Sequence, residues 1–197
     1  MMRPLFTTAR SFGWSLVGGA VVLCAAASFA SAAEPRVELH RKWVEEKDAE
    51  GFYPATSTKG HFSILSPIPF NDYTIIADDP NVGQLVLHGL GSKSADGYEF
   101  GAIETEMNER TKSPDLIALV HDTAAKLGGT VPPLKVEKSG DEEFVFAAVA
   151  GPNRSAFMRV SKTPRSVFTV ACEYPTDQRE IAEDLCGGYL TSFRLSR

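Results

Sequence analysis

The sequence predicts an α+β domain built on a mainly antiparallel β-sheet and flanked by two helices. Several short apolar segments with the alternation of strands are separated by turn residues, and two longer segments repeat their apolar residues at helical spacing. The turns between the later strand segments are only two or three residues long. Connections that short join antiparallel neighbours.

Eight segments fit strands, two of which are apolar on both alternating faces, around 144–149 and 167–171. Such strands are usually central in a sheet and covered on both sides. The loop 91–97 suits a hairpin between the third and fourth strands. The segment 34–60 is left open between strand and helix. The eight strand segments are 61–66, 72–77, 84–90, 98–107, 134–138, 142–150, 155–161 and 166–174.

The first helix is predicted over residues 114–127, with an apolar stripe that begins at Leu116 and ends at Leu127. Ser113 is placed to cap it and Pro114 suits its first position. Gly128 can end the helix, because glycine adopts the left-handed conformation at little cost.

The second helix is predicted over residues 178–193, where Asp177 and Glu180 have the spacing of a capping box. Gly187 and Gly188 weaken its middle, at about 1 kcal/mol per glycine relative to alanine. An interior glycine pair predicts a close approach to the sheet or a local kink.

The first 32 residues read as a signal peptide. Arg3 and Arg10 precede an uncharged apolar stretch, and the small residues Ala30 and Ala32 stand at the −3 and −1 positions of a cleavage site. This predicts a periplasmic or secreted protein with an N-terminal extension over 33–59 and a single domain over 60–197. The alternative is an uncleaved inner-membrane anchor formed by residues 11–33, which are long enough to cross a bilayer.

The composition is acidic, with 20 Lys and Arg against 25 Asp and Glu. Loss of Arg3 and Arg10 with the signal peptide leaves 18 against 25, so the formal charge falls from −5 to −7. Such a surface repels phosphate backbones, and no basic cluster interrupts it. Nucleic acid is therefore excluded as an expected partner.

Two cysteines, Cys172 and Cys186, remain after cleavage, and they are predicted to form a disulfide. By alternation Cys172 shares a strand face with Phe168 and Val170, and Cys186 lies on the apolar stripe of the second helix. Both thiols thus point into one layer between sheet and helix. The alternative is two separately buried thiols.

The sequence contains no recognisable catalytic or metal-binding motif. No nucleophile elbow occurs, and the four histidines, His40, His61, His88 and His121, are too far apart in sequence to form a local metal pair. Acidic residues are plentiful, but none stands out as a catalytic carboxylate. We therefore nominate no catalytic, cofactor-binding or metal-binding residue.

Two stretches carry a resemblance to a known fold. Residues 60–67, GHFSILSP, resemble the opening strand of small secreted domains with a PsbP-like fold, and residues 189–195, YLTSFRL, are similar to the helix that closes them. The resemblance implies an α/β/α sandwich over about residues 60–195. Members of that fold are mainly non-enzymatic envelope or thylakoid-lumen proteins that act through protein partners. No functional residue carries over, and the cysteine pair is not part of the pattern.

These observations lead to three functional hypotheses. The first is a non-enzymatic accessory protein that binds an envelope protein, with the aromatic segments 52–54 or 70–73 as contact surfaces. The second is a carrier that holds a small apolar ligand between the sheet and the helix, in space left by Gly187 and Gly188. The third is a hydrolase whose acidic residues come from separate strands.

Overall fold

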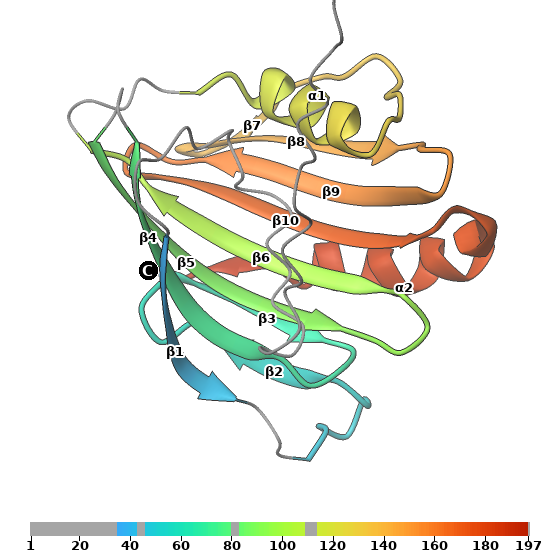
Figure 1. Cartoon of the computed structure of the whole chain (residues 1–197), viewed down its shortest axis with the longest axis horizontal. Helices are drawn as coiled ribbons and strands as arrows, with labels where there is room; N and C mark the ends of the chain where they lie inside the picture. Colours follow the sequence, from blue (N-terminus) through green and yellow to red (C-terminus); the bar gives the residue numbers. More distant parts are fainter. Residues whose placement is uncertain (1–34, 43–45, 80–82, 109–113, 197) are drawn as a thin grey trace, which may run out of the picture.

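A twisted sheet of eight antiparallel strands forms the centre of the molecule (Figure 1). The computed structural model describes residues 35–42, 46–79, 83–108 and 114–196. The strand order is β1-β4-β5-β6-β10-β9-β8-β7, so the middle of the sheet joins the first and second halves of the chain. The strands are β1 (Arg36–Lys42), β4 (Asn71–Asp79), β5 (Gly83–Lys93), β6 (Glu99–Glu106), β7 (Glu137–Ser139), β8 (Glu142–Val149), β9 (Arg154–Lys162) and β10 (Ser166–Pro175).

A second, smaller sheet lies on one face of the large one. It contains β2 (Tyr53–Thr56), β3 (Phe62–Ser66) and β11 (Arg194–Leu195), with β3 in the middle. The small sheet therefore pairs residues near the beginning of the described chain with residues at its end.

The two helices cover opposite faces of the large sheet (Figure 1). The helix α1 (Leu116–Lys126) packs on β8 and β9, while α2 (Arg179–Thr191) packs on the other face against β9, β10 and β3. A short 3₁₀ turn, η1 (Thr176–Gln178), leads from β10 into α2. No helix within the described residues is both long and apolar enough to span a membrane. The proposed signal or anchor segment lies outside the described residues.

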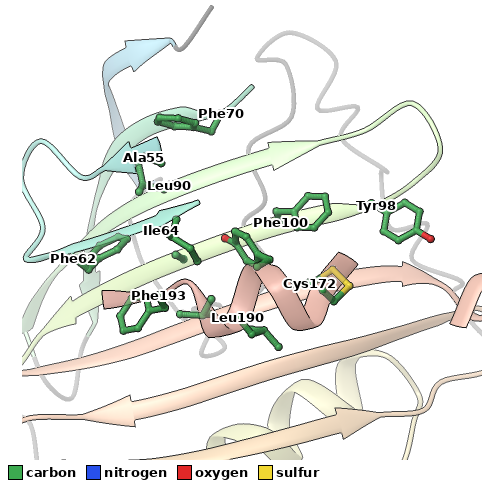
Figure 2. Close-up of a cluster of buried hydrophobic side chains, with 14 of the residues drawn as sticks. Ala55, Phe62, Ile64, Phe70, Leu90, Tyr98, Phe100, Cys172, Leu190 and Phe193 are labelled. Carbon is green, nitrogen blue, oxygen red and sulfur yellow. A yellow bond between two sulfur atoms is a disulfide. The ribbon is translucent and has the colours of Figure 1, made fainter. Parts of the chain in front are cut away.

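The largest hydrophobic core lies between the large sheet, the small sheet and α2 (Figure 2). Aromatic rings form its centre: Phe62 lies edge-on to Phe168, and Phe100 lies edge-on to Tyr189. Edge-to-face pairs of this kind add about 1 kcal/mol beyond their buried area. A second core beneath α1 contains Leu116, Val120, Val145, Met158 and Val160.

The predicted α+β fold is confirmed, with an antiparallel sheet and two flanking helices. Two details of the helix starts differ. Asp115, not Ser113, is the residue that caps α1, because its carboxylate accepts from the amides of Ile117 and Ala118. Ser113 lies outside the described residues. Asp177 falls in the 3₁₀ turn, and Gln178, the N-cap residue just before α2, makes no side-chain capping bond.

The N-terminal extension predicted over residues 33–59 contributes to both sheets. The strand β1 pairs with β4, and β2 pairs with β3, so this part of the chain belongs to the domain. The predicted boundary at residue 60 therefore does not separate two structural units. The strand expected over 134–138 begins only at Glu137 and is the short edge strand β7.

Cys172 and Cys186 form a disulfide, with Cα atoms 5.5 Å apart, in the layer between β10 and α2. Both residues are fully buried in the largest core. The bond thus ties α2 to a central strand at the position that the alternation of β10 and the helical period of α2 predict.

Gly187 and Gly188 do not approach the sheet. An added Cβ would meet no atom within 4 Å at either position, and α2 continues through both residues to Thr191. The expected close approach to the sheet is wrong, because these glycines lie on the outer side of the helix. The core beside α2 is filled, and the void among Phe70, Leu90 and Tyr189 has no room for a water molecule.

Candidate functional site

The loop 57–61, between β2 and β3, is fixed to the large sheet by two buried carboxylates. Asp72 on β4 accepts hydrogen bonds from the amide and the hydroxyl of Thr58. Glu104 on β6 accepts a hydrogen bond from the amide of His61, with 2.6 Å between the amide nitrogen and Oε2. A Cβ at Gly60 would lie 2.7 Å from the Phe62 ring and 3.0 Å from a Glu104 oxygen, so only glycine allows this approach. The loop therefore holds His61 at a defined place over β6.

Glu104 binds three donors, although only 1% of it is exposed. Its Oε2 accepts the His61 amide, and its Oε1 lies 2.6 Å from the Ser166 hydroxyl and 3.2 Å from Nδ1 of His61. A carboxylate can only accept here, so Ser166 and Nδ1 are the donors. In the neutral ring, Nε2 of His61 is then an acceptor. The His61 side chain is 69% exposed, so its Nε2 is accessible to a ligand.

A second row of polar side chains crosses the same face of the sheet from β1 to β6. His40 Nε2 lies 2.6 Å from the Thr74 hydroxyl, which lies 2.9 Å from His88 Nδ1, and His88 Nε2 lies 3.1 Å from Glu106 Oε1. The carboxylate of Glu106 requires Nε2 of His88 to donate. With a neutral ring, His88 Nδ1 then accepts from Thr74, and Thr74 accepts from His40. This row ends beside Glu104, because His88 and Glu104 are opposite each other in the β5–β6 ladder.

The His61 cleft, as we call the cavity beside these groups, has a volume of about 560 Å³. Its rim carries His61, Glu106 and Arg165, and apolar surface comes from Phe168 and Leu195. The remaining lining residues are Glu104, Met107, Thr163, Pro164, Ser166 and Ser196. The cleft thus joins β6, the β9–β10 turn, the loop before β3 and the end of the chain.

The hydrogen bonds in the cleft hold side chains in place. The Ser166 hydroxyl donates to the Glu104 carboxylate, which also accepts two hydrogen bonds from His61, and Ser166 is only 5% exposed. Among the described residues, no three His, Cys, Asp or Glu side chains are placed to hold a metal ion. The arrangement fits a binding site with one exposed acceptor, one anion and one cation around an apolar surface.

The sequence analysis did not find this site, because its polar residues are far apart in the sequence. His61 and Glu104 are 43 positions apart, and Glu104 and Ser166 are 62 apart. One signal was available: Glu104 shares the strand face of Phe100 and Ala102, where alternation places a core residue. A carboxylate at a core position needs buried donors, which is the role of His61 and Ser166.

Two other buried carboxylates lie together on the opposite face of the sheet. Glu173 on β10 stands opposite Glu99 on β6. Lys93 lies 2.7 Å from Glu99, and Arg154 lies 3.3 Å from Glu99 and 3.4 Å from Glu173. The second oxygen of Glu173, Oε1, has no hydrogen-bond partner. Burial raises the pKa of Glu173 to about 7, the attraction of Arg154 opposes this, and the charge of Glu99 adds to it.

This pair satisfies one part of the hydrolase hypothesis, which requires two close, buried carboxylates. Glu99 and Glu173 do not line the His61 cleft, the groove beside Glu180 and Asp184 on α2, or the void beside Phe70. The two aromatic segments expected as contact surfaces differ in burial. Phe70 and Tyr73 are buried, whereas Phe52 and Tyr53 are half-buried and Pro54 is exposed. His121 lies exposed on α1, as its helical phase predicts.

Comparison with known proteins identifies a similar fold but does not assign the chain to a family. No protein-family model matches the sequence, and no curated protein matches it. Among solved structures, the chain is similar to cyanobacterial PsbP (CyanoP) from Synechocystis sp. PCC 6803, with a TM-score of 0.52 and 10% sequence identity. The match covers 74% of this chain and 92% of CyanoP. The expected PsbP-like fold is therefore confirmed, at an identity that supports the fold alone.

Proposed function

We propose that this chain is an exported accessory protein that binds a protein partner of the cell envelope through the His61 cleft. The observation that carries the proposal is the cleft itself. It is open, it has an apolar surface beside polar groups, and its buried hydrogen bonds position His61.

The rim chemistry fits a protein surface. His61 offers an acceptor, Glu106 an anion and Arg165 a cation, and the same cleft is lined by the apolar residues Met107, Phe168 and Leu195. Protein interfaces commonly combine an apolar centre with a polar rim that excludes water. Because Glu104 fixes the loop that carries His61, little conformational freedom would be lost on binding.

Export is supported by the signal segment over residues 1–32 and by the disulfide between Cys172 and Cys186. A buried structural disulfide is typical of proteins in oxidising compartments. Both features suit the periplasm or the extracellular space, with an anchor formed by residues 11–33 as the alternative.

A small-ligand carrier is the second candidate, and one observation favours it. The cleft volume of about 560 Å³ lies in the range of small-molecule sites. A ligand would then sit beside Phe168, at the end of the sheet, and not beside Gly187 and Gly188 as the sequence suggested. The hydrolase hypothesis has less support, because Arg154 and Lys93 engage the Glu99–Glu173 pair.

Site-directed photocrosslinking in intact cells tests the proposal. The chain, expressed with its own signal segment, would carry a photoreactive phenylalanine analogue in place of Arg165, at the cleft rim. The matched control places it at Ile181, which is 67% exposed on the outer side of α2. We expect one discrete crosslinked protein from position 165 and none from 181. His61→Ala should weaken the crosslink, whereas His121→Ala, on α1, should leave it unchanged.

Two results would contradict partner binding. Equal crosslinking from positions 165 and 181 would show that the cleft has no specific role. Native mass spectrometry of the protein recovered from the envelope gives the second test. A constant extra mass that is lost on denaturation would favour the carrier. A mass for residues 33–197, two hydrogens light, is expected if the signal is cleaved and the disulfide is formed.

A further inference from the structure

The edge strand β1 has features of a strand-pairing surface. It pairs with β4 on one side, and within the described ranges no strand pairs with its other side. The opposite edge of the sheet is β7, which is only three residues long and wholly polar and exposed. Short, charged edge strands are the usual protection against unwanted pairing. The strand β1 is longer, with seven residues, and two of its first four residues are apolar.

Two apolar side chains on β1 extend the hydrophobic cluster that contains Tyr73 and Ile75 to this edge. Val37 lies opposite Ile75 and Leu39 opposite Tyr73 in the β1–β4 ladder, so each shares a face with a buried partner. Val37 itself is 46% exposed and Leu39 is 54% exposed. A strand added beside β1 with apolar residues at alternate positions would cover both.

The regular part of this edge is limited by a bulge. The register shifts between Leu39 and Arg41, so His40 has no direct partner on β4. His40 instead bonds to the Thr74 hydroxyl, and Arg41 donates to the Thr56 carbonyl oxygen. These hydrogen bonds stabilise the bulge, and the residues before it keep regular strand geometry.

The net charge of β1 is positive and favours an acidic partner, with Arg36 also paired to Glu38 at 2.7 Å. The strand carries Arg36, Arg41 and Lys42 against a single Glu38, in a chain whose formal charge is −5. A second copy paired antiparallel along the full strand would place Arg36 opposite Lys42. Like charges directly opposite each other destabilise a sheet. An acidic strand would instead meet complementary charges.

We propose that the outer edge of β1 binds an extended segment of a partner protein, with alternating acidic and apolar side chains, which adds a strand to the large sheet. This surface is separate from the His61 cleft. The proposal therefore does not depend on the function assigned to the cleft.

Peptide binding to the full mature chain, with the disulfide formed, tests the proposal. The probes are fluorescently labelled ten-residue peptides of alternating Glu and Val, and of alternating Lys and Val, measured by fluorescence anisotropy. We expect the acidic peptide to bind at least about tenfold more tightly than the basic one. Its affinity should fall as salt rises, because exposed charges are screened.

Substitutions on the protein locate the site. Leu39→Glu adds a repelling charge at a half-exposed position, and it should weaken binding of the acidic peptide by at least about tenfold. Ile181→Glu makes the same kind of change on α2 and should leave binding unaltered. Circular dichroism of both variants shows whether each remains folded.

Three results would overturn the proposal. Neither peptide binds, or both bind equally, or Leu39→Glu leaves the affinity of the folded protein unchanged. Sedimentation of the unmodified chain supplies a separate outcome. A dimer that Leu39→Glu dissociates would assign the edge to a second copy and would refute the acidic partner.

Discussion

Replacing Glu173 with glutamine should remove a pH dependence of stability that the structure places at this residue. Glu173 is only 1% exposed, stands opposite Glu99, and has one oxygen without a donor. Its pKa is raised from 4.5 to about 7. The folded protein therefore binds this proton more tightly than the unfolded chain does. The resulting stability is fully present below pH 4.5 and is lost as the pH rises through about 7.

The size of the effect follows from that difference in pKa. One pKa unit corresponds to about 1.4 kcal/mol, so ionising Glu173 in the folded protein costs about 3 kcal/mol. Most of this cost, about 2 kcal/mol, falls between pH 5 and pH 8. Glutamine cannot ionise, so Glu173→Gln should gain stability relative to the unmodified protein by about that amount over the same range. Loss of the attraction to Arg154 should offset part of the gain at pH 8.

Urea denaturation at pH 5, 6, 7 and 8, with the disulfide intact, measures the effect. Other groups titrate over this range, so the informative quantity is the difference in unfolding free energy between Glu173→Gln and the unmodified protein at each pH. Glu183→Gln is the matched control, because Glu183 is exposed on α2 and pairs with Arg179. A difference that stays constant from pH 5 to pH 8 for Glu173→Gln would refute the reasoning.

Three other predictions concern stability. Glu104→Ala leaves the buried donors of His61 and Ser166 without an acceptor and should cost about 3 kcal/mol in urea denaturation, whereas a loss below about 1 kcal/mol would show that water replaces the carboxylate. Replacing both Cys172 and Cys186 with serine should lower the free energy of unfolding by about 3 kcal/mol. A Tm equal to that of the unmodified protein would show that the disulfide does not stabilise the fold. Gly188→Ala should stabilise the protein by about 1 kcal/mol, because an added Cβ meets no atom within 4 Å in the middle of α2. A lower Tm for this variant would show that the helix is not continuous there.

The type and facing of most elements could be predicted from local patterns. Alternation places Phe168, Val170 and Cys172 on one face of β10, and helical spacing places Cys186 on the buried side of α2. These periods are properties of the backbone, so they hold wherever the element is packed. The disulfide followed from them without knowledge of the tertiary structure.

Other features could not be predicted, because they depend on contacts distant in sequence. The segment that forms β1 and β2 has a mixed pattern, and only pairing with β4 and β3 determines that it is extended. The predicted approach of Gly187 and Gly188 to the sheet is wrong for a similar reason. Residue type shows that the helix is weakened at Gly187 and Gly188, but not which side of the helix faces the sheet.

The sequence by itself determined the class of the fold, the faces of its main strands and the cysteine pair, because these follow from local periodicity and short connections. Only the tertiary structure decided the strand order and the meeting of His61, Glu104 and Ser166 in one cleft. Residues so far apart leave no local signal, since a carboxylate at a core position shows that it needs donors but not which ones. The packing of β3 over β6 brings His61 to Glu104, and the pairing of β10 with β6 brings Ser166.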